Sequence, residues 1–292
     1  MLMPGFDFNE PKNIQEALEF MSRSKGKAKI LSGGTDLIVN LKKGLLSPKS
    51  LMSINRLKDL NQIRASKTKI RIGSCCTVAD IAENGHIKDI FMALNEGAQR
   101  LGSPLIRNLA TIGGNIITAR PAADLPPALI AYGAELVLRK ISGEKIIKID
   151  SFFKGPGKTL LKPDEILTEI RINNPPKHSG AAYIKMGVRE TLEISMVNIA
   201  ALIELDKPNG LIKSARIVLG SVAPIPFLSP SAEKVLLGEK PSKAIFTKAG
   251  EEAAKDSRPI TDFRASAEYR REMVKVLTTR ALSTALSRIQ TS

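Results

Sequence analysis

Two pairs of adjacent glycines are the residues of this sequence best suited to ligand-binding chemistry. Gly33 and Gly34 lie in "SGGTD", and Gly113 and Gly114 lie in "TIGGN", about eighty residues further on. Glycine permits positive φ angles or a very close approach to the main chain. Turns of small residues also expose successive backbone N–H groups that bind phosphate. One such pair is usually an ordinary turn, whereas two pairs favour a dinucleotide held between two lobes.

Other candidate binding residues are less distinctive. The stretch 153–159, "FKGPGKT", resembles a Walker phosphate loop, but the first glycine of that motif would fall on Phe152, so we reject it. Asp124, in "PAADLPP", is either a helix cap or a carboxylate that accepts hydrogen bonds from cofactor hydroxyls. Lys185, in "YIKMG", has the surroundings of a solvated strand residue.

Cysteine and histidine content argues against a metal site in this chain. The two cysteines, Cys75 and Cys76, are adjacent, so they form neither an ordinary disulfide nor a metal cluster. We assign no role to the two histidines, His86 and His178. Without zinc or iron–sulfur ligands, any redox chemistry must come from an organic cofactor. We expect a reduced, cytoplasmic location, because neither an apolar leader nor a membrane-spanning stretch is found.

The chain is strongly basic. Its 292 residues include 44 Lys and Arg against 29 Asp and Glu, which gives a net charge of +15. The basic residues are scattered, which favours a solubilising surface over a dedicated binding surface. An alternative is a basic nucleic-acid-binding protein with purely structural glycine turns, which would be colourless and bind DNA in a salt-dependent way. Aromatic residues make up only 4% and Trp is absent, so base stacking is poorly supplied and we expect no nucleic-acid partner.

The elements around the first glycine pair are predicted by hydrophobic spacing. Helix and strand patterns alternate over residues 1–54, which predicts a small α/β unit with parallel strands. Asn13, with Glu16 three residues later, is a plausible helix N-cap, and Gly44 closes a helix. The predicted elements are a helix over 13–24, a strand over 28–31, a helix over 36–44 and a strand over 50–54.

The rest of the chain divides at a Pro-rich stretch. From residue 55 to 176, short strands and helices alternate with Gly and Pro turns, one of which contains the second glycine pair. Residues 173–180, "NNPPKHSG", are the best linker candidate. Beyond it, strands precede helices, which predicts an α+β domain over 177–292 that ends in a long helix over 268–289.

Five stretches of the sequence resemble the FAD-binding subunit of the molybdenum hydroxylases, a family that includes xanthine, nicotinate and carbon monoxide dehydrogenases. Within them, "GPGKT" and "RASAEYR" look most like bacterial xanthine or purine dehydrogenase subunits. The resemblance implies an α+β protein: a p-cresol methylhydroxylase-like FAD-binding fold of two α/β subdomains, 1–54 and 55–176, followed by a C-terminal domain of the CO dehydrogenase flavoprotein type. The five stretches are 30–37, 106–129, 152–167, 183–201 and 263–274.

The resemblance also implies where FAD binds. The two glycine stretches would hold the diphosphate and ribityl portions, and Asp124 would hydrogen-bond the adenosine end. Leu167 and Lys185 would approach FAD from the second lobe and the C-terminal domain, and Leu101 falls where some relatives place an aromatic ring over the flavin. The implied cofactor-binding residues are Ile30, Leu31, Ser32, Gly33, Gly34, Thr35, Asp36, Leu37, Leu101, Thr111, Ile112, Gly113, Gly114, Asn115, Asp124, Leu167 and Lys185.

The implied function is electron transfer within a larger enzyme. FAD would be held noncovalently, because neither glycine loop contains His or Cys, and no catalytic side chain is needed. Expected partners are a small subunit with two [2Fe–2S] clusters and a large molybdopterin subunit that hydroxylates a purine or similar N-heterocycle. Electrons would pass from the clusters through FAD to an acceptor, and the expected acceptor is NAD⁺. The alternative within enzymes is a stand-alone FAD-dependent oxidoreductase of the same fold.

Overall fold

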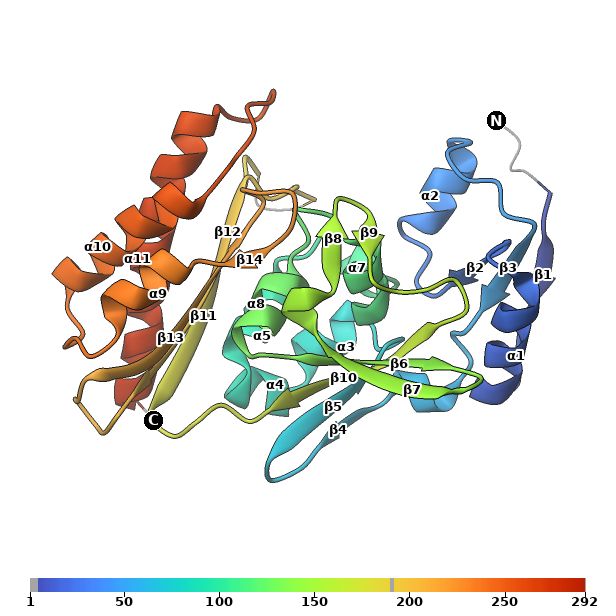
Figure 1. Ribbon diagram of the computed structural model, residues 1–292, viewed down its shortest axis with the longest axis horizontal. Coiled ribbons are helices and arrows are strands. Elements are labelled where there is room, and N and C mark those ends of the chain that lie inside the picture. The colour runs from blue at the N-terminus through green and yellow to red at the C-terminus, as the bar shows by residue number, and fades with distance from the viewer. Residues whose placement is uncertain (1–4, 190–191, 292) are drawn as a thin grey trace.

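The computed structural model describes residues 5–189 and 192–291, and within these ranges the strands form four sheets. Figure 1 shows a three-stranded sheet near the N-terminus, a five-stranded sheet in the middle, and a four-stranded sheet with long helices at the other end. A small hairpin of β8 (Phe153–Gly155) and β9 (Lys158–Thr159) stands beside the middle sheet.

The N-terminal unit is built on parallel strands in the order β1–β3–β2, as the sequence predicts. The predicted helix cap forms, because Asn13 Oδ1 accepts a hydrogen bond from the Glu16 amide at 2.9 Å. Ala17, Leu18 and Met21 on the following helix are buried. The elements are β1 (Asp7–Asn9), α1 (Ile14–Ser24), β2 (Ala28–Leu31), α2 (Leu37–Lys42) and β3 (Ser50–Ser53).

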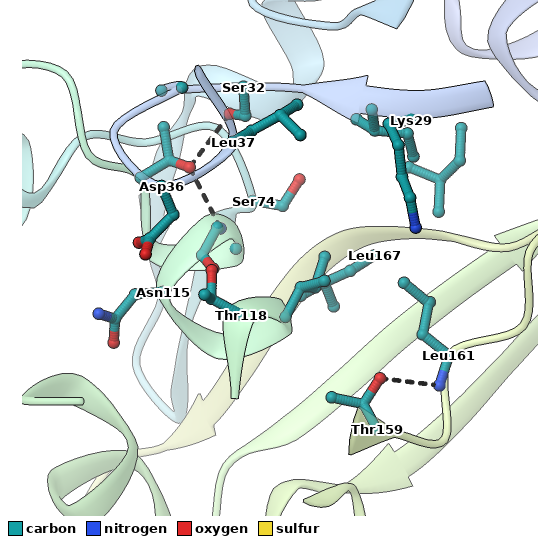
Figure 2. Close-up of a pocket in the computed structure, with 18 of the residues that line it drawn as sticks. Lys29, Ser32, Asp36, Leu37, Ser74, Asn115, Thr118, Thr159, Leu161 and Leu167 are labelled. Carbon is teal, nitrogen blue, oxygen red and sulfur yellow. Dashed lines mark hydrogen bonds between the residues drawn. The ribbon is translucent and has the colours of Figure 1, made fainter. Parts of the chain in front are cut away.

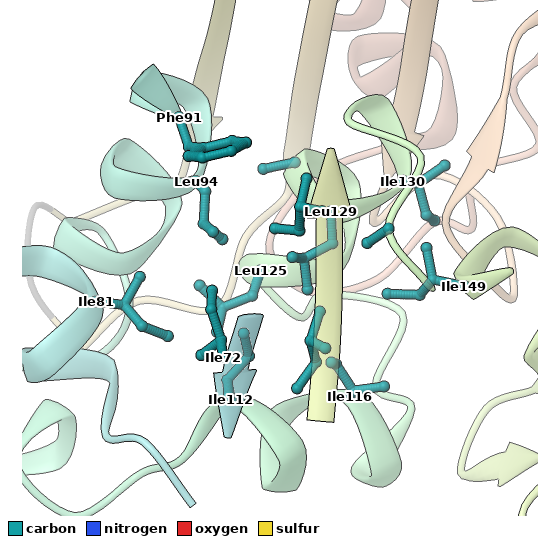
Figure 3. Close-up of a cluster of buried hydrophobic side chains, with 14 of the residues drawn as sticks. Ile72, Ile81, Phe91, Leu94, Ile112, Ile116, Leu125, Leu129, Ile130 and Ile149 are labelled. Carbon is teal, nitrogen blue, oxygen red and sulfur yellow. The ribbon is translucent and has the colours of Figure 1, made fainter. Parts of the chain in front are cut away.

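The middle sheet is antiparallel in the order β4–β5–β10–β6–β7. Short helices pack on it through one large apolar cluster, which contains Ile72 of the sheet and Ile112 and Leu129 of the helices (Figure 3). The elements are η1 (Lys58–Asn61), β4 (Ile63–Ala65), β5 (Lys69–Gly73), α3 (Val78–Glu83), α4 (Gly85–Ile90), α5 (Met92–Gln99), α6 (Pro104–Arg107), α7 (Ile112–Thr118), α8 (Leu125–Ala131), β6 (Glu135–Lys140), β7 (Gly143–Lys148), η2 (Ile149–Ser151) and β10 (Ile166–Asn173).

The second glycine pair lies in a helix, whereas the sequence suggests a turn. Thr111 is the N-cap of α7, and its hydroxyl accepts a hydrogen bond from the Gly114 amide at 3.2 Å. The apolar residues Ile112 and Ile116 are four apart, which buries one side of a helix. This local capping outweighs the low helix propensity of two adjacent glycines.

The C-terminal part has strands followed by helices, as predicted. Its antiparallel sheet, in the order β11–β12–β13–β14, packs on one face against α10 and α11. Its other face belongs to the apolar cluster of the middle unit through residues such as Tyr183 and Leu202, so the middle unit and the C-terminal sheet share one apolar cluster. The elements are β11 (Ser179–Met186), β12 (Val197–Leu205), β13 (Ile212–Gly220), β14 (Phe227–Leu228), α9 (Pro230–Leu236), α10 (Lys243–Asp256) and α11 (Ala267–Thr291).

The predicted linker residues connect the middle sheet to this domain. Strand β10 ends at Asn173 and β11 begins at Ser179, so most of 173–180 lies between the two sheets. Part of the matched stretch 183–201, Glu190 and Thr191, lies outside the described residues. No helix in the described part of the chain is long and apolar enough to span a membrane.

Candidate functional site

A cavity of about 1070 Å³ lies between the N-terminal unit and the middle unit. Its walls come from β2 and the turn after it, from α2, from α7, and from the β8–β9 hairpin with the segment that leads into β10. Figure 2 shows Ser32, Ser74, Asn115 and Leu167 lining it. The cavity therefore lies between the two lobes that the paired glycines suggested.

Most of the predicted cofactor-binding residues line this cavity. Leu31 and Ile112 do not, and Ile112 is buried in the apolar cluster of the middle unit. Asp124 and Lys185 do not line it either. The predicted residues that line the cavity are Ile30, Ser32, Gly33, Gly34, Thr35, Asp36, Leu37, Leu101, Thr111, Gly113, Gly114, Asn115 and Leu167.

The first glycine turn offers a row of unpaired amides to the cavity. Among the hydrogen bonds of the described residues, the backbone N–H groups from Ser32 to Leu37 donate to no protein acceptor. Gly34 has a φ angle of +72°, which favours glycine, and a Cβ on Gly33 would lie only 1.9 Å from the Leu109 carbonyl oxygen. Successive free amides of this kind form an anion-binding turn.

The second glycine pair does not form such an anion-binding turn, which corrects our expectation. The Ile112 amide donates to the Cys76 carbonyl and the Gly113 amide donates to the Ser74 carbonyl, while Gly114 donates to the Thr111 hydroxyl. A Cβ on Gly113 would lie 2.6 Å from the Ser74 carbonyl oxygen, so this glycine is required by protein packing. At Gly114, the same test finds only the Thr111 hydroxyl, at 3.0 Å.

Asp124 and Lys185 form a buried contact between the middle unit and the C-terminal domain. The Asp124 carboxylate accepts hydrogen bonds from the Tyr183 hydroxyl at 2.8 Å and from Lys185 Nζ at 2.9 Å. Lys185 also donates to the Arg100 carbonyl at 3.0 Å, next to the cavity residue Leu101. Burial raises the pKa of Asp124, and Lys185 and Tyr183 offset part of that rise. Their predicted contact with a cofactor stays a prediction.

The cavity wall also contains basic residues that sequence reasoning missed. Part of the β8–β9 hairpin, including Thr159, also lines the cavity. The hairpin sequence is the one that we rejected as a Walker phosphate loop. Of the two lining carboxylates, Asp36 pairs with Arg120 at 3.5 Å and Glu165 pairs with Lys145 at 2.7 Å. No motif spacing indicated the basic positions, because they come to the cavity from separate places in the chain: from β2, from the segment after α7, from the β8–β9 hairpin and from the loop before β10. The basic lining residues are Lys29, Arg120, Lys154, Lys158 and Lys162.

The lining chemistry fits a large anionic dinucleotide. The free amides and basic side chains suit a diphosphate, and apolar side chains such as Leu101, Ile106 and Leu167 suit an aromatic ring system. Among the described residues, no cluster of three His, Cys, Asp or Glu residues has the geometry to hold a metal ion. Fold and site together define a protein that holds a dinucleotide between two α/β units.

Comparison with known families specifies this class further. Residues 4–175 match the model for the FAD binding domain in molybdopterin dehydrogenase, and residues 181–285 match the CO dehydrogenase flavoprotein C-terminal domain. The chain belongs to the FAD-binding medium subunits of the molybdenum hydroxylase family, and it is an oxidoreductase subunit.

Similar proteins cover the chain along nearly its whole length. The glyceraldehyde dehydrogenase medium chain of Sulfolobus acidocaldarius is 33% identical over 96% of this chain and 98% of its own. The putative xanthine dehydrogenase FAD-binding subunit of Escherichia coli K12 is 30% identical over 97% of each chain. A chain in the structure of Hydrogenophaga pseudoflava carbon monoxide dehydrogenase, 30% identical, superposes with a TM-score of 0.94 over 99% of both chains.

Proposed function

We propose that this chain carries FAD as the electron-transfer subunit of a multi-subunit molybdenum hydroxylase, between the [2Fe–2S] clusters of a partner and an acceptor. The observation that carries the proposal is the row of free amides from Ser32 to Leu37 in a cavity with basic walls. Bound FAD supplies the electron chemistry, which no side chain provides. The protein binds and orients it.

The residues divide this task by their chemistry. The Ser32–Leu37 amides would hold the diphosphate, in a cavity whose walls also contain basic side chains such as Lys29. Leu101 and Leu167 flank the flavin ring and keep water from it, so the electrostatic contacts act in a drier environment. No described cavity residue is His or Cys, which supports noncovalent binding. We place the FAD-binding part at 1–176 and the C-terminal domain at 177–292, since all lining residues fall between Met21 and Leu167.

The partners and acceptor follow from the family. A small [2Fe–2S] subunit and a large molybdopterin subunit complete the enzyme, and NAD⁺ is the proposed acceptor in the cytoplasm. The resemblance of "GPGKT" and "RASAEYR" to xanthine dehydrogenase subunits supports a purine or similar N-heterocycle as the substrate. The relative at 33% identity, a glyceraldehyde dehydrogenase medium chain, favours an aldehyde as the second candidate substrate.

The first test is flavin content. The purified full chain should be yellow and release one FAD on denaturation, and a colourless chain that binds no added FAD would contradict the proposal. The complex isolated from the native source should then contain Mo and Fe and reduce NAD⁺ with either hypoxanthine or an aldehyde. If the purified chain alone oxidises a substrate, the stand-alone oxidoreductase replaces this proposal.

A further inference from the structure

Ser74 is a buried cavity residue with an unsatisfied hydroxyl group. It lies directly after β5, is 3% exposed, and lines the cavity beside Ser32 and Leu167 (Figure 2). Its Oγ has no hydrogen-bond partner among the described residues. A buried polar group without a partner is destabilising, so native proteins usually pair such groups or use them for ligands.

The main chain fixes Ser74 in this position. Its amide donates to the Thr168 carbonyl of β10 at 3.0 Å, and its carbonyl accepts from the Gly113 amide of α7 at 2.9 Å. A Cβ on Gly113 would lie 2.8 Å from the Ser74 Cβ, so the bare glycine leaves room for the serine side chain. Two elements of the middle unit therefore hold Ser74 against the cavity.

Neighbouring groups do not satisfy the Ser74 hydroxyl. The Ser32 hydroxyl donates to the Thr111 hydroxyl at 3.1 Å, and Thr111 also caps α7. The adjacent Cys75 thiol, a weak hydrogen-bonding group, accepts from the Ser32 hydroxyl at 3.5 Å and donates to the Ile54 carbonyl at 3.8 Å. The hydroxyl proton of Ser74 thus remains available to a ligand in the cavity.

We propose that the Ser74 hydroxyl donates a hydrogen bond to the diphosphate of the bound dinucleotide, from the middle unit and next to the Ser32–Leu37 turn. The inference rests on the proposed function. It extends that function because both lobes then contact the diphosphate. The N-terminal unit contributes its free amides, and the middle unit contributes the Ser74 hydroxyl, since the amides around Gly113 already donate to protein acceptors.

The test is a hydroxyl deletion with a matched control. Ser74→Ala removes the proposed donor, and Thr278→Val removes another buried hydroxyl without a partner, on α11 and outside the cavity lining. Full-length chains, stripped of flavin, are titrated with FAD, ADP and riboflavin. Ser74→Ala should weaken FAD and ADP binding about tenfold or more, as expected for a hydrogen bond to a charged group, and leave riboflavin binding unchanged. Thr278→Val should change none of the three.

Protein stability distinguishes a ligand contact from a packing role. Ligand-free Ser74→Ala should melt at or above the temperature of the wild type, because an unpaired buried hydroxyl is removed. Equal affinities of wild type and Ser74→Ala for ADP overturn the inference, and so does a loss that is confined to riboflavin. If the wild type binds neither FAD nor ADP, the proposed function itself fails.

Discussion

At the scale of residues, the two glycine pairs have different physical causes. Gly33 is required because the Leu109 carbonyl passes beside it, and Gly34 because its φ angle is positive. Gly113 is required by the Ser74 carbonyl, and a Cβ on Gly114 would meet only the Thr111 hydroxyl oxygen, at 3.0 Å. A ligand is therefore the direct reason for fewer of these glycines than the sequence pattern suggests.

Adjacent substitutions in α7 should separate folding from binding. Gly113→Val would press a side chain into the Ser74 backbone and should destabilise the chain by about 3 kcal/mol or more. Gly114→Val carries the same β-branched cost in the helix, but its Cβ would meet only the Thr111 hydroxyl and the residue lines the cavity, so it should give a folded, flavin-poor protein. Circular dichroism melting and flavin content measure the two effects, and full flavin content in Gly114→Val would contradict the assignment.

The sequence located the cavity walls well and individual contacts less well. Most residues of the two glycine stretches, 30–37 and 111–115, line the cavity, because turn-forming residues are recognisable from their immediate neighbours in sequence. Ser74 and Lys158 were missed because they reach the cavity only through the packing of β5 and the β8–β9 hairpin. Asp124 was assigned to the cofactor, yet its visible partners are Lys185 and Tyr183, which are brought to it from a strand some sixty residues away.

At the scale of elements, the start of α11 is fixed by a compact ion network. Asp262 pairs with Arg264 at 2.6 Å and with Arg270 at 2.8 Å, and the buried Arg270 also donates to the Met196 carbonyl at 2.9 Å. The hydrogen bond from Arg264, together with Arg270, holds the pKa of Asp262 well below its ordinary value of 3.8. The matched stretch 263–274 thus contains a structural anchor, which its sequence resemblance alone did not explain.

This network should make stability depend on pH in acid. Because the folded-state pKa of Asp262 is depressed, its contribution is complete above the ordinary value of 3.8 and is lost as pH falls below it. Asp262→Asn should lower stability at pH 7 by about 2 kcal/mol, less than for a fully buried pair. It should also flatten the decline between pH 4 and pH 2. Urea unfolding across this range measures both, and parallel curves for wild type and variant would contradict the role.

At the scale of the whole molecule, the C-terminal domain does not line the cofactor cavity, but it shares an apolar cluster with the middle unit, which does. The lining residues all precede β11, yet Tyr183 and Leu202 pack in the same apolar cluster as the middle unit. Glu96 of α5 also accepts a hydrogen bond from the Tyr183 amide at 2.8 Å and pairs with Arg288 of α11. The sequence correctly predicted that the FAD-binding part precedes the C-terminal domain. It did not predict the contacts between them, because contacts between distant segments produce no local sequence pattern.

Removal of the C-terminal domain should therefore abolish a cavity that it does not line. A fragment of residues 1–176 would expose the apolar face of α8 to water and should aggregate or bind no FAD. Size-exclusion chromatography and flavin content compare it with the full chain. A monomeric, yellow fragment would show that the shared core is dispensable.

The division of the cavity between two sheets has a mechanical consequence. Ser32 belongs to a unit with parallel strands and Ser74 to one with antiparallel strands. A molecule that contacts both residues therefore bridges the two units. Occupancy and the alignment of the two sheets are then thermodynamically linked. Removal of the bridging molecule should therefore loosen the N-terminal unit relative to the middle unit, and a change that tilts the N-terminal unit should weaken binding of that molecule.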